Sequence, residues 1–237
     1  MNVSKKENDG LNTTFFWEMI DLAWMKAECF GARDGGLRES ILAGSVPASD
    51  AEMAPFCKAL EAVLLTDLKA PAFAKFAETW DRMVFELDRE VLADHIGLGD
   101  DGFGDARSTV VALGKAHFEA VLADPKAALV GGACERLSYL VDETYEARLG
   151  RPRGRSGWDT STGSNLAHWP AKRAKVEAKA RVTRAADDLW NQLGLKPGAT
   201  ASATVIGLVG HVTQSQMEDA ILQVAQRIQR GRSAARG

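Results

Sequence analysis

Two groups of side chains in this sequence have types and spacings that could support binding or catalysis. The first contains three acids and an arginine that can form ion pairs or line a polar pocket: Asp81, Asp100, Asp101 and Arg107. Arg107 lies six residues after Asp101, too far for the usual contact between neighbouring helical turns. We therefore expect this cluster to form an ion pair between helices that stabilises the fold. A polar ligand pocket is the alternative.

The second group is basic and aromatic and begins at residue 151. It contains spaced arginines, two tryptophans, a histidine and the cations of a following helix: Arg151, Arg153, Arg155, Trp158, His168, Trp169, Lys172, Arg173, Lys175 and Lys179. Such cations can follow a phosphate backbone, and indole rings can stack on bases. They can equally face solvent, bind a protein partner, or cover the acidic part of the chain or of a second copy. The tryptophans either anchor their segment onto the helices or face a partner.

Familiar catalytic and metal-binding patterns are missing from the sequence. We find no phosphate-binding glycine loop, no nucleophile elbow, and no histidine or cysteine spacing typical of zinc. The acids of residues 100–105 lack EF-hand spacing, so we expect them to cap a helix or favour its positive end. We predict no metal and no cofactor.

Composition indicates a cytoplasmic globular protein. No apolar run approaches the roughly 18–20 residues that span a bilayer, and no apolar signal segment follows the N-terminal lysines. The cysteines, Cys29, Cys57 and Cys134, are odd in number and form no CxxC pair. We expect each of them to be a small, buried hydrophobic side chain in a reducing compartment.

Apolar periodicity predicts that an all-α N-terminal domain of several helices positions these residues. A capping box at Ser49 and a cap at Asp124 mark helix starts, and Gly150 marks a helix end. The predicted helices cover residues 14–30, 49–68, 71–91, 100–122 and 124–150, with a short helical turn at 37–42 and an interruption at 131–132.

Charge divides the chain at residue 150. Residues 1–150 carry 26 Asp and Glu against 15 Lys and Arg, a net charge of −11, whereas residues 151–237 carry a net charge of +8. We therefore predict a helical domain at 14–150, an irregular basic linker at 151–169 and a helical extension at 170–237. The extension contains one long helix from Pro170 to about Leu193.

The remainder of the extension is less regular in its pattern. Residues 199–212 are small and β-branched, which suits one short strand, although a buried helix or turn is equally consistent. A lone strand could pair across a dimer. A last amphipathic helix is expected after Ser215.

Part of the N-terminal domain resembles a bacterial family of unknown function that is sometimes joined to WGR domains. The family reads approximately SDDGFxxFRxWLIxxGRExFExALxDPDSLA, and the positions that match it here are Asp100, Asp101, Gly102, Phe103, Arg107, Gly114, Phe118, Glu119, Leu122, Asp124 and Pro125. Further matches are Phe16, Trp17, Ile20, Ala23, Trp80, Asp81, Tyr145, Glu146 and Gly150. The resemblance covers residues 14–150 and implies a bacterial, cytoplasmic, mainly helical domain without an assigned activity.

The chain departs from that family in three places. Thr109 replaces a tryptophan, the charged FELDREVLADHIG replaces an apolar stretch, and no counterpart exists after residue 150. Our first functional hypothesis is a non-enzymatic interaction module that binds a protein partner or itself through its C-terminal part. The alternatives are a nucleic-acid-associated protein using residues 151–184 and an enzyme of unknown reaction. We expect no membrane partner.

Overall fold

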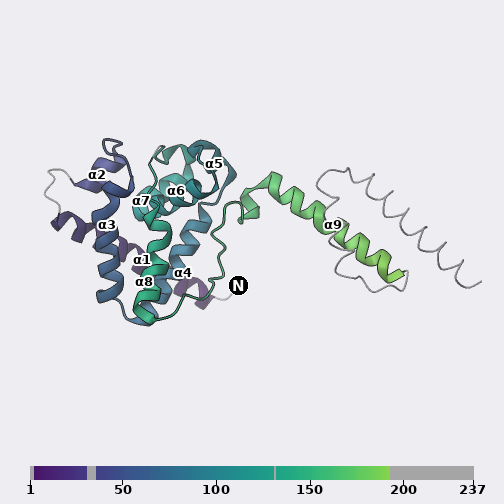
Figure 1. The fold of residues 1–237 in the computed structure, drawn as a ribbon, viewed down its shortest axis with the longest axis horizontal. Helices are drawn as coiled ribbons and strands as arrows, with labels where there is room; N and C mark the ends of the chain where they lie inside the picture. Colours follow the sequence, from purple (N-terminus) through teal and green to yellow (C-terminus); the bar gives the residue numbers. More distant parts are fainter. Residues whose placement is uncertain (1–2, 31–35, 131, 193–237) are drawn as a thin grey trace, which may run out of the picture. The chain divides into compact units, whose positions relative to one another are not determined.

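The computed structural model describes residues 3–30, 36–130 and 132–192, and the chain divides into two compact units, Met1–Trp169 and Pro170–Gly237. The described residues form helices and no strands, which confirms the predicted all-α class (Figure 1). The helices of the first unit are α1 (Val3–Phe30), α2 (Leu37–Leu42), α3 (Asp50–Ala62), α4 (Ala70–Glu86), α5 (Glu90–Ile96), α6 (Asp100–Ala112), α7 (Lys115–Ala123) and α8 (Arg136–Leu149). The second unit contains α9 (Pro170–Gln192).

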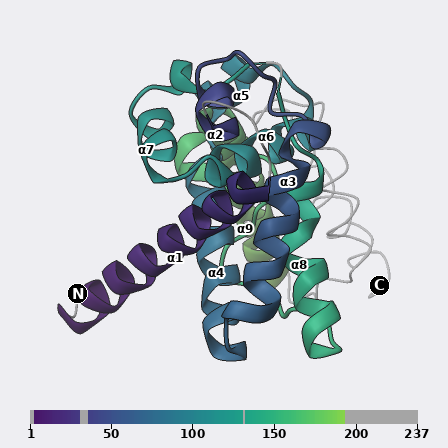
Figure 2. The same ribbon diagram turned by 90° about the vertical axis from the view of Figure 1, so that its left-hand side faces the viewer.

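Helices α3, α4 and α8 run beside one another in the first unit, and α1 crosses them (Figures 1 and 2). Helices α5, α6 and α7 gather at one end, where α6 packs on both α4 and α8 (Figure 1). α1 and α8, the first and last helices of this unit, therefore both pack against α3 and α4.

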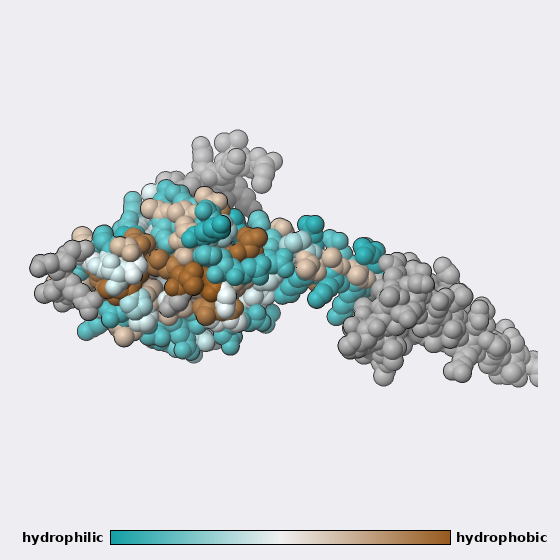
Figure 3. All heavy atoms as spheres, turned by 90° about the horizontal axis from the view of Figure 1, so that it is seen from above, coloured by the Kyte–Doolittle hydropathy of each residue, from teal (hydrophilic) through white to brown (hydrophobic). Residues whose placement is uncertain are grey.

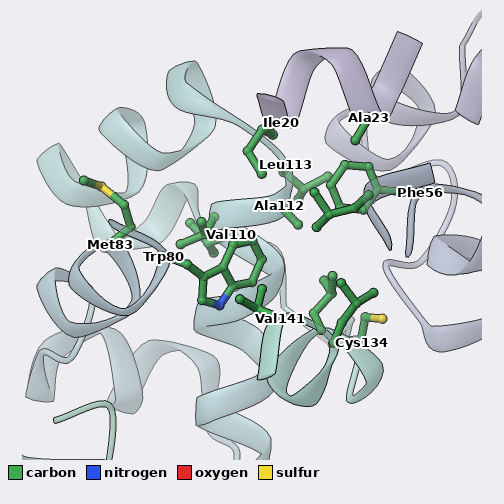
Figure 4. Packing of buried hydrophobic residues seen from close by; sticks show 14 of the residues in the cluster. Ile20, Ala23, Phe56, Trp80, Met83, Val110, Ala112, Leu113, Cys134 and Val141 are labelled. Atoms are coloured by element: carbon green, nitrogen blue, oxygen red, sulfur yellow. The ribbon is translucent and has the colours of Figure 1, made fainter. Parts of the chain in front are cut away.

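Aromatic side chains fill the core of the first unit. Trp24 stacks on Phe56 with ring centroids 4.5 Å apart. Trp80, Val110 and Val141 come from three different helices and point toward one another (Figure 4). These residues belong to one buried cluster, and burying one such side chain contributes roughly 1.5–3 kcal/mol to folding.

The helix predicted over residues 71–91 is wrong, because the chain forms two helices there. α4 ends at Glu86, α5 begins at Glu90, and the fully buried Asp88 lies between them. Val91, which the apolar stripe would place inside, is 60% exposed. The helix is interrupted where the Asp88 carboxylate turns inward to bind a later segment of the chain.

The helix predicted over residues 100–122 is also interrupted. Gly114, between α6 and α7, has a φ of 98°, in the left-handed region that favours glycine. Trp24 Nε1 donates to the carbonyl of the last α6 residue at 2.7 Å, and Arg38 Nε donates to the Leu113 carbonyl at 2.9 Å. These side-chain donors replace the backbone N–H groups of another helical turn, so α6 can end there.

Two of the predicted helix caps differ from the structure. Ser49 is the N-cap of α3, as predicted, but its side chain does not make the capping hydrogen bond that a capping box requires. Gly99 occupies the N-cap of α6, which places Asp100 and Asp101 in the first turn, where they still face the positive helix end. The Asp124 carboxylate accepts from the Lys126 N–H at 3.0 Å, but it caps only the 3-10 turn Pro125–Ala127. The helix predicted to start at Asp124 is therefore wrong in its first part, and α8 begins at Arg136.

The C-terminal part can be compared with the prediction only in part. The helix predicted from Pro170 to about Leu193 is confirmed by α9. The candidate strand at 199–212 and the last helix after Ser215 lie outside the described residues. α1 begins at Val3, about ten residues before its predicted start.

Some large apolar side chains of the first unit remain exposed to solvent. Apolar residues gather in the middle of the face seen from above, among polar ones (Figure 3). Met25, Val91 and Val130 are between 57% and 63% exposed. No helix among the described residues is long and apolar enough to cross a membrane.

Candidate functional site

A polar cleft of about 990 Å³ lies on the first unit, between α4, α6, α8 and residues 153–162. We call residues 151–169 the strap, because this irregular segment follows α8 and lies along the helices (Figure 1). The cleft is lined by acids, arginines, hydroxyl groups and two tryptophans. Its charged side chains are Asp81, Asp100, Asp101, Asp105, Asp142, Asp159, Arg107, Arg153 and Arg155.

Arg153 of the strap joins two helices at one wall of the cleft. Its guanidinium contacts both oxygens of Asp81, on α4, at 2.7 and 2.9 Å, and its Nε donates to Asp142, on α8, at 2.7 Å. Burial acts to lower the pKa of Arg153. The hydrogen bonds that Arg153 makes with Asp81 and Asp142, together with the negative charges of these two residues, outweigh burial and raise the pKa. Arg153 is therefore a structural clamp.

Asp88 holds the other end of the strap. Its fully buried carboxylate accepts hydrogen bonds from the backbone N–H groups of Gly163 and Asn165, both at 2.8 Å. It also accepts from Ser164 Oγ at 3.2 Å and from Trp169 Nε1 at 3.0 Å. A carboxylate offers about four acceptor sites, so these four donors satisfy Asp88 and fix this part of the strap on the helices.

Arg107 lies beside Asp88 beneath the strap and is also fully buried. It donates to the Val84 carbonyl at 3.2 Å and to the Thr160 carbonyl of the strap at 2.8 Å, and its Nη1 is 3.9 Å from Asp88 Oδ1. Burial lowers the pKa of Arg107, and the charge of Asp88 acts in the opposite direction. Its guanidinium lies 4.7 Å from the centre of the Phe103 ring.

The four residues of the first predicted group are thus placed around the cleft without pairing with one another. Arg107 is near Asp88, and Asp81 binds Arg153. Asp100 and Asp101 line the cleft and are exposed. The Asp100 backbone carbonyl, rather than its side chain, accepts from Thr162 of the strap at 3.1 Å.

The two tryptophans of the strap contact aromatic rings of the helical unit. The Trp158 ring lies 5.3 Å from that of Phe85, and the Trp169 ring lies 6.4 Å from that of Phe103. Trp169 also donates to Asp88, so both indoles participate in holding the strap. These contacts leave less of either ring for stacking on a nucleic-acid base.

The remaining predicted basic residues are exposed. Arg151, Arg155 and His168 lie on the surface of the first unit. In the second unit, α9 exposes Lys172, Arg173, Lys175 and Lys179. Arg173 lies 3.6 Å from Glu177, one turn further along the same helix.

Sequence reasoning missed Asp88, although more strap contacts meet there than at any predicted acid. It stands in the charged FELDRE stretch at the end of an apolar stripe, and a carboxylate there resembles any other helix-end acid. One feature of the sequence could have pointed to Asp88, because this charged stretch is one of the places where the chain departs from the family pattern.

The cysteines only partly follow their prediction. Cys57 and Cys134 are buried, with sulfur atoms 3.8 Å apart, whereas Cys29 is exposed, so the expectation of burial is wrong for Cys29. Cys134 also donates to Asp50 at 3.1 Å. The hydrogen bond between these two thiols lowers the pKa of Cys57 and raises the pKa of Cys134. Among the described residues, no three His, Cys, Asp or Glu side chains are grouped to hold a metal ion.

Comparison with known proteins identifies a family but no activity. Residues 11–147 match the model of a protein of unknown function (DUF4240). No curated protein and no solved structure matches the chain. The match spans more than half of the chain and includes α2 to α7 and most of α1 and α8, but it ends before the strap. The chain therefore belongs to the DUF4240 family.

Proposed function

We propose that this chain is a non-enzymatic interaction module that binds a protein partner, or a second copy of itself, through its C-terminal part. The observation that carries the proposal is the row of exposed cations on α9. Arg153, Trp158 and Trp169 are engaged within the first unit, so they contribute little to an external surface. The exposed basic surface that remains is concentrated on α9.

The chemistry of α9 suits an acidic protein surface. The helix has 23 residues and carries six Lys and Arg against three Asp and Glu. Val176 adds an apolar side chain that is 44% exposed, so the helix offers both charge and apolar contact. Such a helix can lay one face against a partner and use its cations to steer the encounter.

A bacterial cytoplasm is part of the same proposal. It rests on the family resemblance over residues 14–150. The exposed apolar residues of the first unit support a second contact area, because apolar patches on soluble proteins often mark interaction sites.

The test combines sedimentation velocity with capture of partners from the native host. A variant carrying Lys172→Glu, Lys175→Glu and Lys179→Glu should lose self-association or lose the captured partner. A control with the same charge change at exposed positions of the first unit, Lys58→Glu, Lys69→Glu and Lys75→Glu, should retain it. Equal behaviour of the two triple variants would argue against α9 as the binding surface.

Nucleic-acid binding is a second candidate that the exposed cations of α9 also support. It predicts that affinity for DNA or RNA falls steeply with salt, by a logarithmic slope of roughly 0.9 for each phosphate neutralised on duplex DNA. Fluorescence anisotropy at several salt concentrations measures this slope. Absent or salt-insensitive binding would exclude this candidate.

A further inference from the structure

The strap is held as a bound peptide would be held. We call the receiving surface the strap groove, formed by Asp81, Phe85, Asp88, Arg107 and Asp142. The groove binds a strap guanidinium, a strap carbonyl, two strap amide groups and an indole N–H. Peptide recognition commonly combines backbone hydrogen bonds with pockets for chosen side chains.

The groove and its occupant belong to different parts of the chain. All five groove residues lie within residues 11–147, which match the family, whereas the strap begins after that match ends. The receptor surface is thus part of the family domain, and the occupant is part of the extension that follows it.

The groove needs an occupant, because its central charges are buried. Asp88 is fully buried and takes its four hydrogen bonds from the strap. Arg107 donates one of its hydrogen bonds to the strap as well. A charge that loses its hydrogen-bond donors is destabilised, so an empty groove is unfavourable and any replacement occupant must supply the same donors.

We infer that the strap groove is a peptide-binding site whose second occupant is the strap of another copy of this chain. This inference rests on the proposed function, because it specifies how self-association through the C-terminal part would occur. A second strap presents the same guanidinium, amides and indole in the same order. Mutual exchange gives a two-fold symmetric dimer in which each copy supplies one groove and one strap.

The connection between α8 and the strap permits this exchange. Gly150 ends α8 with a φ of 67°, and Arg151 and Pro152 after it are exposed. A few residues at the end of a helix can absorb the dihedral change of a hinge. Exchange also places a strap with three arginines and one aspartate against residues 1–150 of another copy, which carry a net charge of −11.

Mass action determines when exchange occurs. A short connection gives the chain's own strap an effective concentration in the millimolar range, so a dilute copy fills its own groove. Exchange is expected at high protein concentration or where the chain's own strap cannot dock. The experiments therefore use the full chain with its own strap disabled.

Gly163→Pro disables the strap without changing the groove. Gly163 has a φ of 73° and its N–H donates to Asp88, and proline has neither that φ nor the N–H. A fluorescent peptide of residues 151–169 should bind the Gly163→Pro protein saturably, with one site per chain. Its binding to the wild-type protein should be weaker by about 10-fold or more, because the groove is filled.

Two controls make the peptide experiment specific. The same peptide carrying Gly163→Pro should not bind, and the protein that combines Gly163→Pro with Asp88→Asn should lose most of its affinity. Circular dichroism establishes that each protein remains helical. Failure of the wild-type peptide to bind the Gly163→Pro protein at about 1 mM, or equal binding of both peptides, would overturn the inference.

A complementation experiment tests exchange between full chains. The Gly163→Pro chain has an intact groove and a disabled strap, whereas the Asp88→Asn chain has an intact strap and a weakened groove. Light scattering should detect a species of twice the monomer mass when the two are mixed, and much less of it in either alone. A mixture that scatters as the sum of its components would overturn the inference.

The failure of this inference can be told from the failure of the proposed function. The triple lysine variant of α9 leaves the groove and strap unchanged. If the mixture stays monomeric while association that depends on α9 persists, the inference fails and the proposed function stands. If the mixture dimerises but α9 changes have no effect on any association, the groove is a binding site and α9 is not.

Discussion

Asp88 is the single residue on which most contacts between the strap and the helices converge. It accepts two backbone amides, a hydroxyl and an indole N–H, and the buried Arg107 lies 3.9 Å away. Neither charge is satisfied by solvent. At the scale of single residues, the position of the strap therefore depends on this carboxylate.

Asp88→Ala should destabilise the first unit by about 3 kcal/mol, because it removes four acceptor contacts and leaves Arg107 buried without an opposite charge. Urea unfolding followed by circular dichroism measures the change. Asp94→Ala, at an exposed acid on α5, is the control and should cost less than about 0.5 kcal/mol. Similar costs for both variants would contradict the assigned role.

His117 should make stability depend on pH. Burial, and to a lesser extent the charge of Arg38, lower its pKa below the ordinary 6.5, and its Nε2 has no hydrogen-bond partner among the described residues. The unfolded chain thus binds the proton more readily, so stability should fall as pH drops below about 6.5 toward the lowered folded pKa. Burial raises the pKa of Glu86, which acts with the opposite sign.

Comparing variants separates these two effects. Thermal unfolding between pH 7.5 and 5.5 should show a smaller loss for His117→Gln than for the wild type, with His168→Gln at an exposed position as the control. An identical pH profile for wild type and His117→Gln would show that His117 does not contribute.

At the scale of elements, helix ends are determined by side chains from other helices. α6 stops where Trp24 of α1 and Arg38 of α2 take its last carbonyls, and Gly114 turns the chain into α7. α4 stops where Asp88 turns toward the strap. The apolar periodicity of both regions continues past these points and contains no sign of them.

Gly114→Ala should cost more stability than Gly97→Ala. Both glycines have positive φ, at 98° and 70°, so each substitution is strained by roughly 1 kcal/mol or more. A Cβ on Gly114 would also lie 1.6 Å from Arg38 Nη2 and would displace that side chain, whereas a Cβ on Gly97 meets nothing within 4 Å. Chemical unfolding of both variants measures the difference, and equal losses would contradict it.

At the scale of the whole molecule, the strap extends the helical domain beyond the family match. The first compact unit runs to Trp169 rather than to residue 150, because the strap is clamped at Arg153, Asp88 and Trp169. The change of charge at residue 150 therefore falls inside one compact unit. The basic segment after it begins as a structural part of the acidic domain.

A double-mutant cycle across Asp81 and Arg153 should show this dependence. Arg153→Met should cost about 2 kcal/mol because it leaves the nearly buried Asp81 unpaired, and adding Asp81→Asn should recover about 1 kcal/mol of that loss. Arg155→Met, at an exposed strap position, should change stability by less than about 0.5 kcal/mol. Additive losses in the cycle would contradict direct coupling between the two residues.

The sequence by itself determined the features that depend on local patterns, namely the helical class and some of the helix ends. Apolar spacing predicted an all-α chain and the helix from Pro170, and Gly150 marked the end of its helix correctly. Asp124 forms the cap that its sequence predicts, but of a short 3-10 turn. The family pattern around Asp100 located the matched domain. These features depend on residues a few positions apart, so their periodicity and capping chemistry are visible in the chain.

Only the tertiary structure decided which polar groups meet. Asp81 binds Arg153 across 72 residues and Asp88 binds Gly163 across 75, and no local spacing encodes either pair. The same holds for the approach of Trp24 to the end of α6, 88 residues later. Long-range pairs depend on how the helices pack, so their partners become apparent only once the core has assembled.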